Sequence, residues 1–157
     1  MKKPDFSVTH KDPGLVQLVQ QTDHRILAVW AAECAARVLM HFELQQPQDP
    51  RPRQALDRLQ AWIDTGVFRM AEIRGASLAA HAAAREVGED GAARSAARAA
   101  GQAVATAHVP THSVGAANYA LQAVHRASAP VDAPTAVANE REWQRKRLLE
   151  LRGGPTS

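Results

Sequence analysis

Histidines and a single cysteine are the side chains of this sequence best suited to bind a metal ion or attack a substrate. His108 and His112 are four residues apart, the spacing at which two imidazoles on an unbroken helix can bind zinc. Pro110 lies between them and breaks the helix, and no cysteine pair or carboxylate–histidine group is nearby. We therefore expect no metal site. His108 is interpreted as bonding the last carbonyls of one helix and His112 as lying near the cap of the next, the alternative being a pocket lined by both rings.

The candidate nucleophiles lack the surroundings that catalysis needs. Cys34 falls on the apolar face of a predicted helix, where a thiol is usually inert because a reactive thiolate needs an exposed, electropositive setting. Ser77 and His81 could touch on a helix, but no acid is placed to orient the imidazole. The glycines do not form the phosphate-binding pattern that follows a strand. We expect no catalytic residue, no cofactor and no enzymatic activity.

Six polar side chains interrupt alanine-rich segments and could line a small polar pocket. If several of them face inward, they must satisfy one another's hydrogen bonds, either as a network that specifies the core or as the lining of a cavity. These residues are Glu33, His81, Gln102, Thr106, His108 and Tyr119.

Two arginines and two tryptophans are the candidate anchors for a protein partner. The stretch DPRPR places Arg51 and Arg53 on a proline-stiffened loop, where each guanidinium can clasp a carboxylate of this protein or of a partner. The clasp within this protein is the favoured interpretation. Trp62 and Trp143 complete the set of candidate anchors, because aromatic and arginine side chains dominate protein interfaces.

The elements that must position these groups are predicted to be helical. Alanine makes up about a fifth of the chain, aromatic residues are few, and alternating runs of β-branched residues are missing. We predict an all-α fold, a compact single-domain bundle of about seven helices with short loops. From Asp23 to about Glu43 apolar residues recur at every fourth position, which predicts a broad apolar face and the central helix of the bundle. Glu33 and Arg37 have the spacing of an ion pair within that helix.

Capping residues, prolines and glycines delimit the other helices. Thr111 is a candidate cap. The predicted helices cover residues 13–21, 23–43, 52 to a stop at Gly66, 70–87, 91–107, 111 or 112 to 127, and 134–152. We expect a flexible arm over residues 1–11, one helical domain over 12–152 that includes a basic C-terminal helix over 132–152, and a disordered tail over 153–157.

The segment from residue 91 to 107 predicts an unusually close helix contact. Its core side consists of alanines and one valine, which bury little area but let helix axes approach closely. Arg94, Arg98 and Gln102 form a polar row on the same helix. On the following helix, Gly115 and its neighbours again permit close contact.

Charge and composition exclude several classes of protein. The chain has 157 residues, a net charge of +3 and one cysteine, so it cannot form an internal disulfide, and we expect it in the reducing cytoplasm. No segment resembles a signal peptide or is apolar enough to span a membrane. Basic and acidic residues are interspersed and no nucleic-acid-binding module is present, so nucleic acid is a disfavoured partner.

The final helix, WQRKRLLELR, carries the highest local density of basic residues. It could dock on nucleic acid or on a membrane surface. Its apolar residues Trp143, Leu148 and Leu151 would more simply pack on the body of the protein or on a second subunit. A homodimer through this helix is therefore one of the expected assemblies.

Three blocks of the sequence carry a family pattern. A W-A-x-x-C-A-x-x-V-L-x-x-F-E helix starting at Trp30 leads into P-x-D-x-R-P-R. An H-A-A-A-R segment starts at His81, and A-G-Q-A-x-A-T-A-H-V starts at Ala100. In the order and spacing of these blocks, roughly residues 12 to 127 resemble the bacterial Imm-5-like putative immunity proteins. The last helix lies outside the resemblance.

The resemblance implies an all-helical protein that protects a bacterium from a toxin of its own polymorphic toxin system. Immunity proteins generally bind a cognate toxin tightly and occlude its active site, without catalysis. Inhibitors of nucleases are often acidic whereas this chain is basic, so a nuclease toxin is disfavoured. The alternative function is a small-molecule-binding protein or an unrecognised enzyme, with a pocket lined by Glu33, His81, Gln102, His108 and Tyr119.

Overall fold

The computed structural model describes residues 6–8 and 12–153, which form eight α-helices and no strand. The helices are α1 (Pro13–Gln20), α2 (His24–Ala36), α3 (Met40–Glu43), α4 (Arg51–Thr65), α5 (Met70–Glu86), α6 (Ala92–Ala105), α7 (His112–Ala127) and α8 (Ala133–Leu151). The all-α prediction is confirmed, with seven helices of eight residues or more and one four-residue turn, α3. Most of the predicted arm and tail lie outside the described residues.

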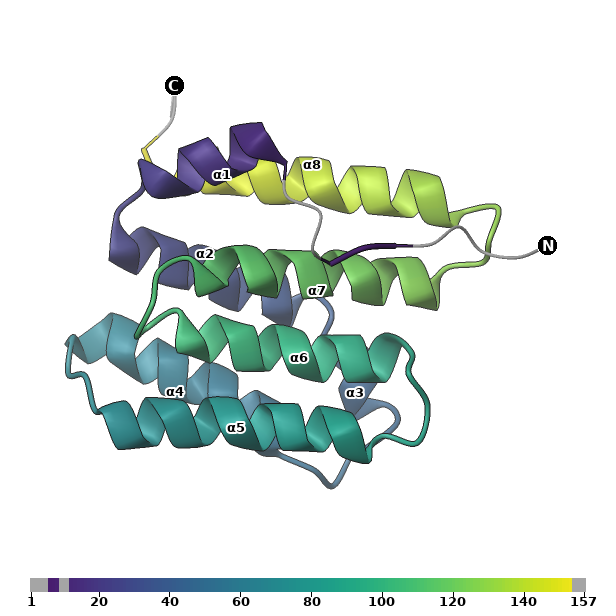
Figure 1. Ribbon diagram of the computed structural model, residues 1–157, viewed down its shortest axis with the longest axis horizontal. Coiled ribbons are helices and arrows are strands. Elements are labelled where there is room, and N and C mark those ends of the chain that lie inside the picture. Colours follow the sequence, from purple (N-terminus) through teal and green to yellow (C-terminus); the bar gives the residue numbers. More distant parts are fainter. Residues whose placement is uncertain (1–5, 9–11, 154–157) are drawn as a thin grey trace.

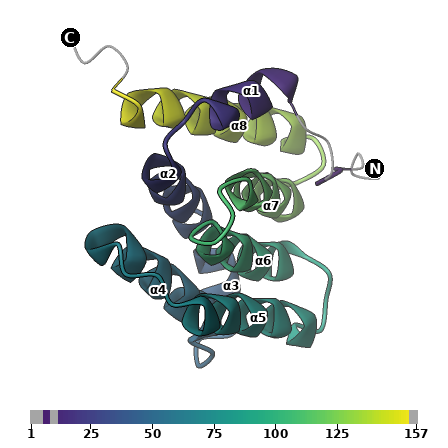
Figure 2. The same ribbon diagram turned by 60° about the vertical axis from the view of Figure 1, so that its left-hand side comes forward.

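Three consecutive helices form a layer in which each lies beside the next. In Figure 1, α5, α6 and α7 run side by side, with α4 and α2 behind them and α8 covering α7 and α2 at the top. Figure 2 shows the same arrangement from the side, with α1 lying along α8. Because α6 contacts α5, α7, α4, α2 and α3, it is the most enclosed helix of the bundle. The segment predicted to be central, 23–43, lies to one side of it.

The predicted helix over 23–43 is interrupted after Ala36. The amide of Val38 bonds the carbonyl of Ala35 at 3.2 Å, and the amide of His41 bonds that of Val38 at 3.1 Å. These are three-residue spacings, tighter than an α-helix. The tightened turn separates α2 from α3 while keeping Val38, Leu39 and Phe42 in the core, whereas Met40 is exposed.

Local caps set several of the helix ends that the sequence predicts. The carboxylate of Asp12 accepts a hydrogen bond from the amide of Gly14 at 2.9 Å, which caps α1. Gly66 has a φ of 70°, the left-handed conformation that glycine adopts without strain, and it ends α4. Thr111 precedes α7 but its side chain makes no capping bond, so the predicted cap is wrong in that detail.

The alanine side of α6 is buried as predicted. Ala96, Ala97 and Ala100 are fully buried, and so are Ala99 and Ala103 on the flanks of the predicted face. Small side chains on nearly every side of one helix allow its neighbours to pack closely around it. The seam formed by α5, α6 and α7 is therefore the tightest part of the core.

Two glycines make room in this seam for polar side chains of the neighbouring helix. A Cβ added at Gly101 would lie 2.7 Å from Nε2 of His81 on α5. A Cβ added at Gly115 would lie 2.7 Å from Oε1 of Gln102 on α6. Both positions therefore require glycine for close approach rather than for backbone conformation.

The Gly101→Ala substitution should be unfavourable only while the imidazole of His81 is present. The new methyl group would displace that ring, which offsets the gain of about 0.5–1 kcal/mol that alanine brings to a helix interior. In the His81→Ala background the same substitution should increase the free energy of unfolding by about that amount. Chemical denaturation of the four proteins measures the coupling, which we expect to be about 1 kcal/mol. A coupling near zero would show that the two groups do not compete for space.

Helix α8 is fastened to the body by buried contacts. Nε1 of Trp30 donates to the carbonyl of Gln144 at 2.8 Å, and Nε2 of Gln144 donates to the carbonyl of Ala117 at 3.0 Å. Leu148 is fully buried beside them. The apolar side of α8 therefore packs on α2 and α7, which agrees with the simpler interpretation of this helix in the sequence.

None of the described helices is long and apolar enough to cross a membrane.

Candidate functional site

The six residues of the predicted polar pocket lie at several different helix contacts. Glu33 on α2 accepts hydrogen bonds from Arg147 on α8 at 2.7 and 3.1 Å. The carbonyl of Thr106, at the end of α6, accepts a hydrogen bond from Nε2 of His24 at 2.5 Å. Tyr119 is partly buried against the core on α7. Each of these residues joins a different pair of elements or the core, and they do not converge on one site.

Two of the six, His81 on α5 and Gln102 on α6, lie in the seam formed by α5, α6 and α7. Nη1 of Arg98 donates to Nδ1 of His81 at 3.1 Å, and Nδ1 of His112 donates to Oε1 of Gln102 at 2.8 Å. Both side chains are thus held by partners on neighbouring helices. In the structure these two groups connect neighbouring helices. That they line a pocket stays a prediction.

The environment of His81 predicts a loss of stability in mild acid. Burial, followed by the charges of Arg98, Arg85 and His112, lowers the pKa of His81 from 6.5 to about 4. Between these two values the unfolded chain binds a proton that the folded chain does not, so acid favours unfolding. The free energy of unfolding should therefore fall as pH drops from 6.5 to 4, and His81→Gln should make that decline shallower. Denaturant titrations at intervals across this range measure both slopes, and identical slopes would contradict the assignment.

The candidate nucleophiles are held in packing contacts. Oγ of Ser77 donates to the carbonyl of Gly101 at 2.9 Å, so Ser77 does not pair with His81. Cys34 is fully buried, and burial raises the pKa of its thiol well above the ordinary value. Neither arrangement resembles an activated nucleophile.

His108 and His112 contact different elements at the joint between α6 and α7. The bond of His112 to Gln102 directs its ring onto α6. The ring of His108 stacks on Phe68, with centroids 5.9 Å apart and planes at 18°. In place of the predicted contact with helix carbonyls, His108 thus reaches the turn between α4 and α5.

The four predicted anchors make contacts within this protein. Arg51 binds Asp49 at 2.7 Å and Glu86 at 2.6 Å. Arg53 binds Glu43 at 2.6 Å. The internal clasp that the sequence favours is therefore present at both arginines.

The two tryptophan anchors also have neighbours in this chain. Trp62 packs on the core, with its ring centroid 4.8 Å from that of His24. The guanidinium of Arg37 lies over the ring of Trp143 at 3.9 Å. A partner could use only the part of each ring that these contacts leave exposed.

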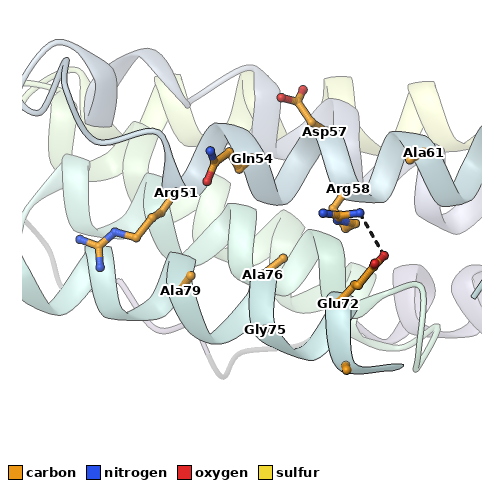
Figure 3. Close-up of a pocket in the computed structure, with 10 residues that line it drawn as sticks. Arg51, Gln54, Asp57, Arg58, Ala61, Glu72, Gly75, Ala76 and Ala79 are labelled. Carbon is orange, nitrogen blue, oxygen red and sulfur yellow. Dashed lines mark hydrogen bonds and ion pairs between the residues drawn. The ribbon is translucent and has the colours of Figure 1, made fainter. Parts of the chain in front are cut away.

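A shallow groove of about 560 Å³ lies between α4 and α5 (Figure 3). Its floor includes Gly75 and Ala76, and its rim carries Arg58 and Glu72, which form an ion pair at 3.0 Å. Arg51 and Asp57 of α4 also line it, although the carboxylate of Asp57 points away from α5 in Figure 3. The lining residues comprise two arginines and two carboxylates, so the groove offers a ligand no net charge.

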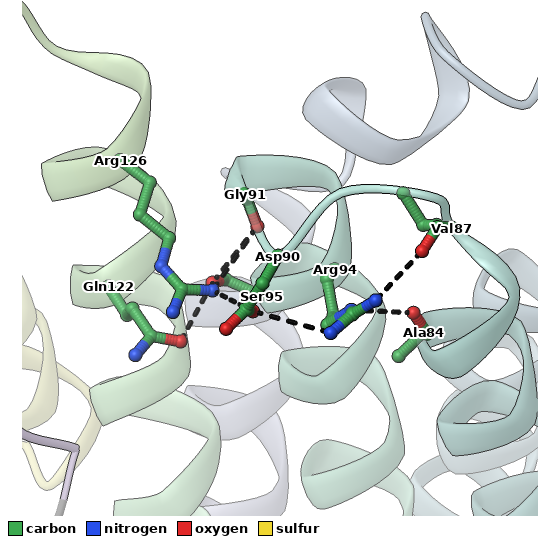
Figure 4. Close-up of polar contacts among 8 residues, drawn as sticks. All are labelled: Ala84, Val87, Asp90, Gly91, Arg94, Ser95, Gln122 and Arg126. Atoms are coloured by element: carbon green, nitrogen blue, oxygen red, sulfur yellow. Dashed lines mark hydrogen bonds and ion pairs between the residues drawn. The ribbon is translucent and has the colours of Figure 1, made fainter.

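Two arginines hold the end of the α5–α7 layer at which the chain passes from α5 to α6 (Figure 4). Arg94 donates to the carbonyls of Ala84 and Val87 at 3.1 and 2.8 Å, which satisfies the end of α5. Arg126 on α7 donates to Asp90 at 2.6 Å and to Oγ of Ser95 at 3.0 Å. These contacts fix the loop between α5 and α6, and their charges are satisfied within the protein.

An apolar patch is exposed at the opposite end, where α4 turns into α5. We call Val67, Phe68, Met70 and Leu78 the apolar patch; they are 55%, 42%, 43% and 58% exposed. Val67 and Phe68 reach solvent because Gly66 ends α4 just before them and α5 begins only after Arg69, whose backbone is extended. Met70 and Leu78 lie on the exposed side of α5 itself. Sequence reasoning missed it, although two apolar residues directly after a helix-ending glycine were a usable signal.

A pocket of about 350 Å³ opens beside the apolar patch. It is lined by Met70, Arg74 and Leu78 of α5, together with Ala105 and His108. Phe68 adjoins it through the stacked ring of His108. Such a pocket can receive an apolar side chain, with a guanidinium at its edge.

The side of α5 that faces away from α4 is basic. The acids of α5 point the other way, since Glu72 binds Arg58 and Glu86 binds Arg51, both on α4. We call Arg74, Arg85 and Arg98 the basic face; none of them forms an ion pair with any residue that the structure describes. Arg74 and Arg85 share the exposed side of α5 with Leu78, and Arg98 joins them across His81.

Comparison with known proteins gives one family. A family model described as "Imm-5 like putative immunity protein" matches residues 17–151. The match extends through α8, beyond the end of the resemblance read from the sequence. No curated protein and no solved structure matches the chain.

Proposed function

The chain belongs to the Imm-5 like putative immunity protein family, and from this membership we propose that it neutralises a cognate bacterial toxin by binding it stoichiometrically, without catalysis. The observation that carries the proposal is the match over residues 17–151, which spans α2 to α8. Neutralisation by binding needs a rigid surface of about 800 Å² on each partner and a few anchoring side chains. We also propose that the protein acts in the cytoplasm, where its single free cysteine is compatible with reducing conditions.

The candidate groups for chemistry support binding rather than catalysis. Cys34 is buried, and Ser77 and His81 have separate structural partners. The apolar patch, in contrast, is exposed and lies next to a pocket. An exposed apolar cluster with polar groups around it is typical of a protein-binding surface.

The anchors predicted from the sequence would have secondary roles in this proposal. Arg51 and Arg53 would have to exchange a carboxylate of this chain for one of the partner. Trp62 and Trp143 would contribute only the exposed part of their rings. A homodimer through α8 would have to use the outer side of that helix, because its apolar side packs on the body.

The proposal is tested with toxins encoded beside this gene. Each candidate toxin domain is expressed in a sensitive bacterium with and without this protein. We expect growth to be restored by one of them, and the purified pair to form a complex that saturates at one molecule per toxin in isothermal titration calorimetry. Neutralisation by far less than one equivalent would instead indicate catalysis, and failure to bind or to neutralise any neighbouring toxin would overturn the proposal.

A further inference from the structure

We infer that the toxin docks on the exposed side of α5 and α6, where the apolar patch takes an apolar side chain of the toxin and the basic face meets its acidic residues. The inference rests on the proposed function and adds the location and the chemistry of the contact. It assigns to the toxin an acidic segment with an apolar residue near its end.

Charge is the first argument for an acidic occupant. On the α4 side of α5 every rim arginine has a carboxylate partner, as Arg58 has in Glu72. On the opposite side Arg74, Arg85 and Arg98 have no carboxylate partner among the described residues. Unpaired guanidinium groups on one face attract carboxylates and speed their approach. The two sides of α5 thus differ in the charge of the partner that they fit.

Shape supplies the second argument. The pocket of about 350 Å³ lies at one end of the basic face, and Arg74 and Leu78 belong to both the pocket and the exposed side of α5. An apolar side chain in this pocket would place neighbouring carboxylates of the toxin along α5, in reach of Arg74 and then Arg85. Binding anchors commonly combine a buried apolar group with arginine contacts in this way.

The surface is also held in place before a partner arrives. His81 is seated over Gly101 and receives a hydrogen bond from Arg98, while Phe68 stacks on His108. A surface that is already ordered loses less conformational entropy on binding, which strengthens the complex.

Other occupants fit this face less well. Two copies of the chain would bring Arg74 and Arg85 of one against the same arginines of the other, and like charges in contact oppose association. The described part of the N-terminal segment lies elsewhere, since Phe6 contacts the ring of His125 and Val8 accepts a hydrogen bond from Asn118, both on α7. A partner protein with an acidic surface is therefore the occupant that the face favours.

The test compares two double variants with equal changes of charge. Arg74→Glu with Leu78→Asp alters the proposed surface on α5. Lys146→Glu with Leu149→Asp makes the same changes on α8, where Leu149 is 41% exposed. Circular dichroism and thermal unfolding should show that both variants fold like the wild type, because all four positions are exposed.

Affinity for the toxin identified by neutralisation is measured for the three proteins. We expect the α5 variant to bind about 100-fold more weakly than the wild type and the α8 variant to change by less than about threefold. Equal binding by the α5 variant and the wild type would overturn the inference while leaving the proposed function standing. Absence of binding by the wild type would overturn both the inference and the proposed function.

Crosslinking locates the contact without relying on a destabilising change. The photoreactive residue p-benzoylphenylalanine is introduced at Leu78 or, as the control, at Leu149. We expect the toxin to be captured from Leu78 alone, and the captured peptide to contain acidic residues. Capture from Leu149 alone, or a captured peptide that is basic, would contradict the inference.

Discussion

Replacing Trp30 by alanine should lower the free energy of unfolding by about 3–5 kcal/mol. Trp30 is fully buried on α2, and its Nε1 donates to the carbonyl of Gln144 on α8 at 2.8 Å. The substitution would leave a cavity in the core and a buried carbonyl without its donor, and each effect is unfavourable. Because this side chain connects α2 to α8, the loss should also loosen the C-terminal helix.

Guanidinium chloride denaturation followed by circular dichroism measures this effect. The matched control is Trp143→Ala, which removes the same atoms from a partly exposed site where the ring is covered by Arg37. We expect the control to lose no more than about 2 kcal/mol, since less buried area disappears. Equal losses at the two positions would mean that the interior contact of Trp30 is not what fastens α8.

The Ala100→Leu variant should lose about 1–3 kcal/mol of stability although it adds apolar surface. Ala100 is fully buried in the middle of α6, between helices on nearly every side. The extra carbon atoms have no space to occupy, so either side chains leave their preferred rotamers or the helices move apart. Ala117, equally buried on α7, should respond in the same way.

The control for overpacking is Ala138→Leu on the exposed side of α8. There the same enlargement should change the free energy of unfolding by less than about 0.5 kcal/mol. Thermal and chemical denaturation of both variants give the comparison. A stable Ala100→Leu variant would show that the seam around α6 has room and that the small side chains are not what sets the helix spacing.

The helices could be predicted because their signals are local. Asp12 before Pro13 and Gly66 after Thr65 act on the residues next to them, and the structure places the ends of α1 and α4 there. The alanine-rich side of α6 followed in the same way from its spacing along one helix. Patterns within about twenty residues therefore predicted helix type and most helix ends, and they identified the core side of α6.

Partners that are distant in the sequence could not be predicted. Glu33 and Arg37 have the spacing of an ion pair within α2, yet Glu33 binds Arg147 and Arg37 binds Glu140, both on α8. A bidentate contact with a distant helix outcompetes a solvent-exposed pair, which contributes only about 0.3–0.5 kcal/mol. Arg37, which binds Glu140, is also the first residue after the end of α2 at Ala36. The spacing of apolar residues in the sequence did not predict that helix end.

The exposed surface was predicted least well. The sequence directed attention to Arg51 and Arg53, whose carboxylate partners become visible only in three dimensions. Whether Arg74 is paired depends on which side of α5 faces α4, and composition does not contain that information. The apolar patch depends in turn on the direction in which the chain leaves Gly66.

The order of the helices along the chain has a consequence for synthesis. Helices α5, α6 and α7 are consecutive, so their contacts can form from nearby segments, and such contacts form fast. The hydrogen bond from Trp30 to Gln144 can instead form only after a further 114 residues have been synthesised. At ribosomal speeds this delay is on the order of ten seconds. During that time α4, α6 and α7 can already cover part of α2, but the side of α2 that packs on α8 stays open to chaperones. Each new chain therefore keeps an apolar surface exposed until its last helix has left the ribosome.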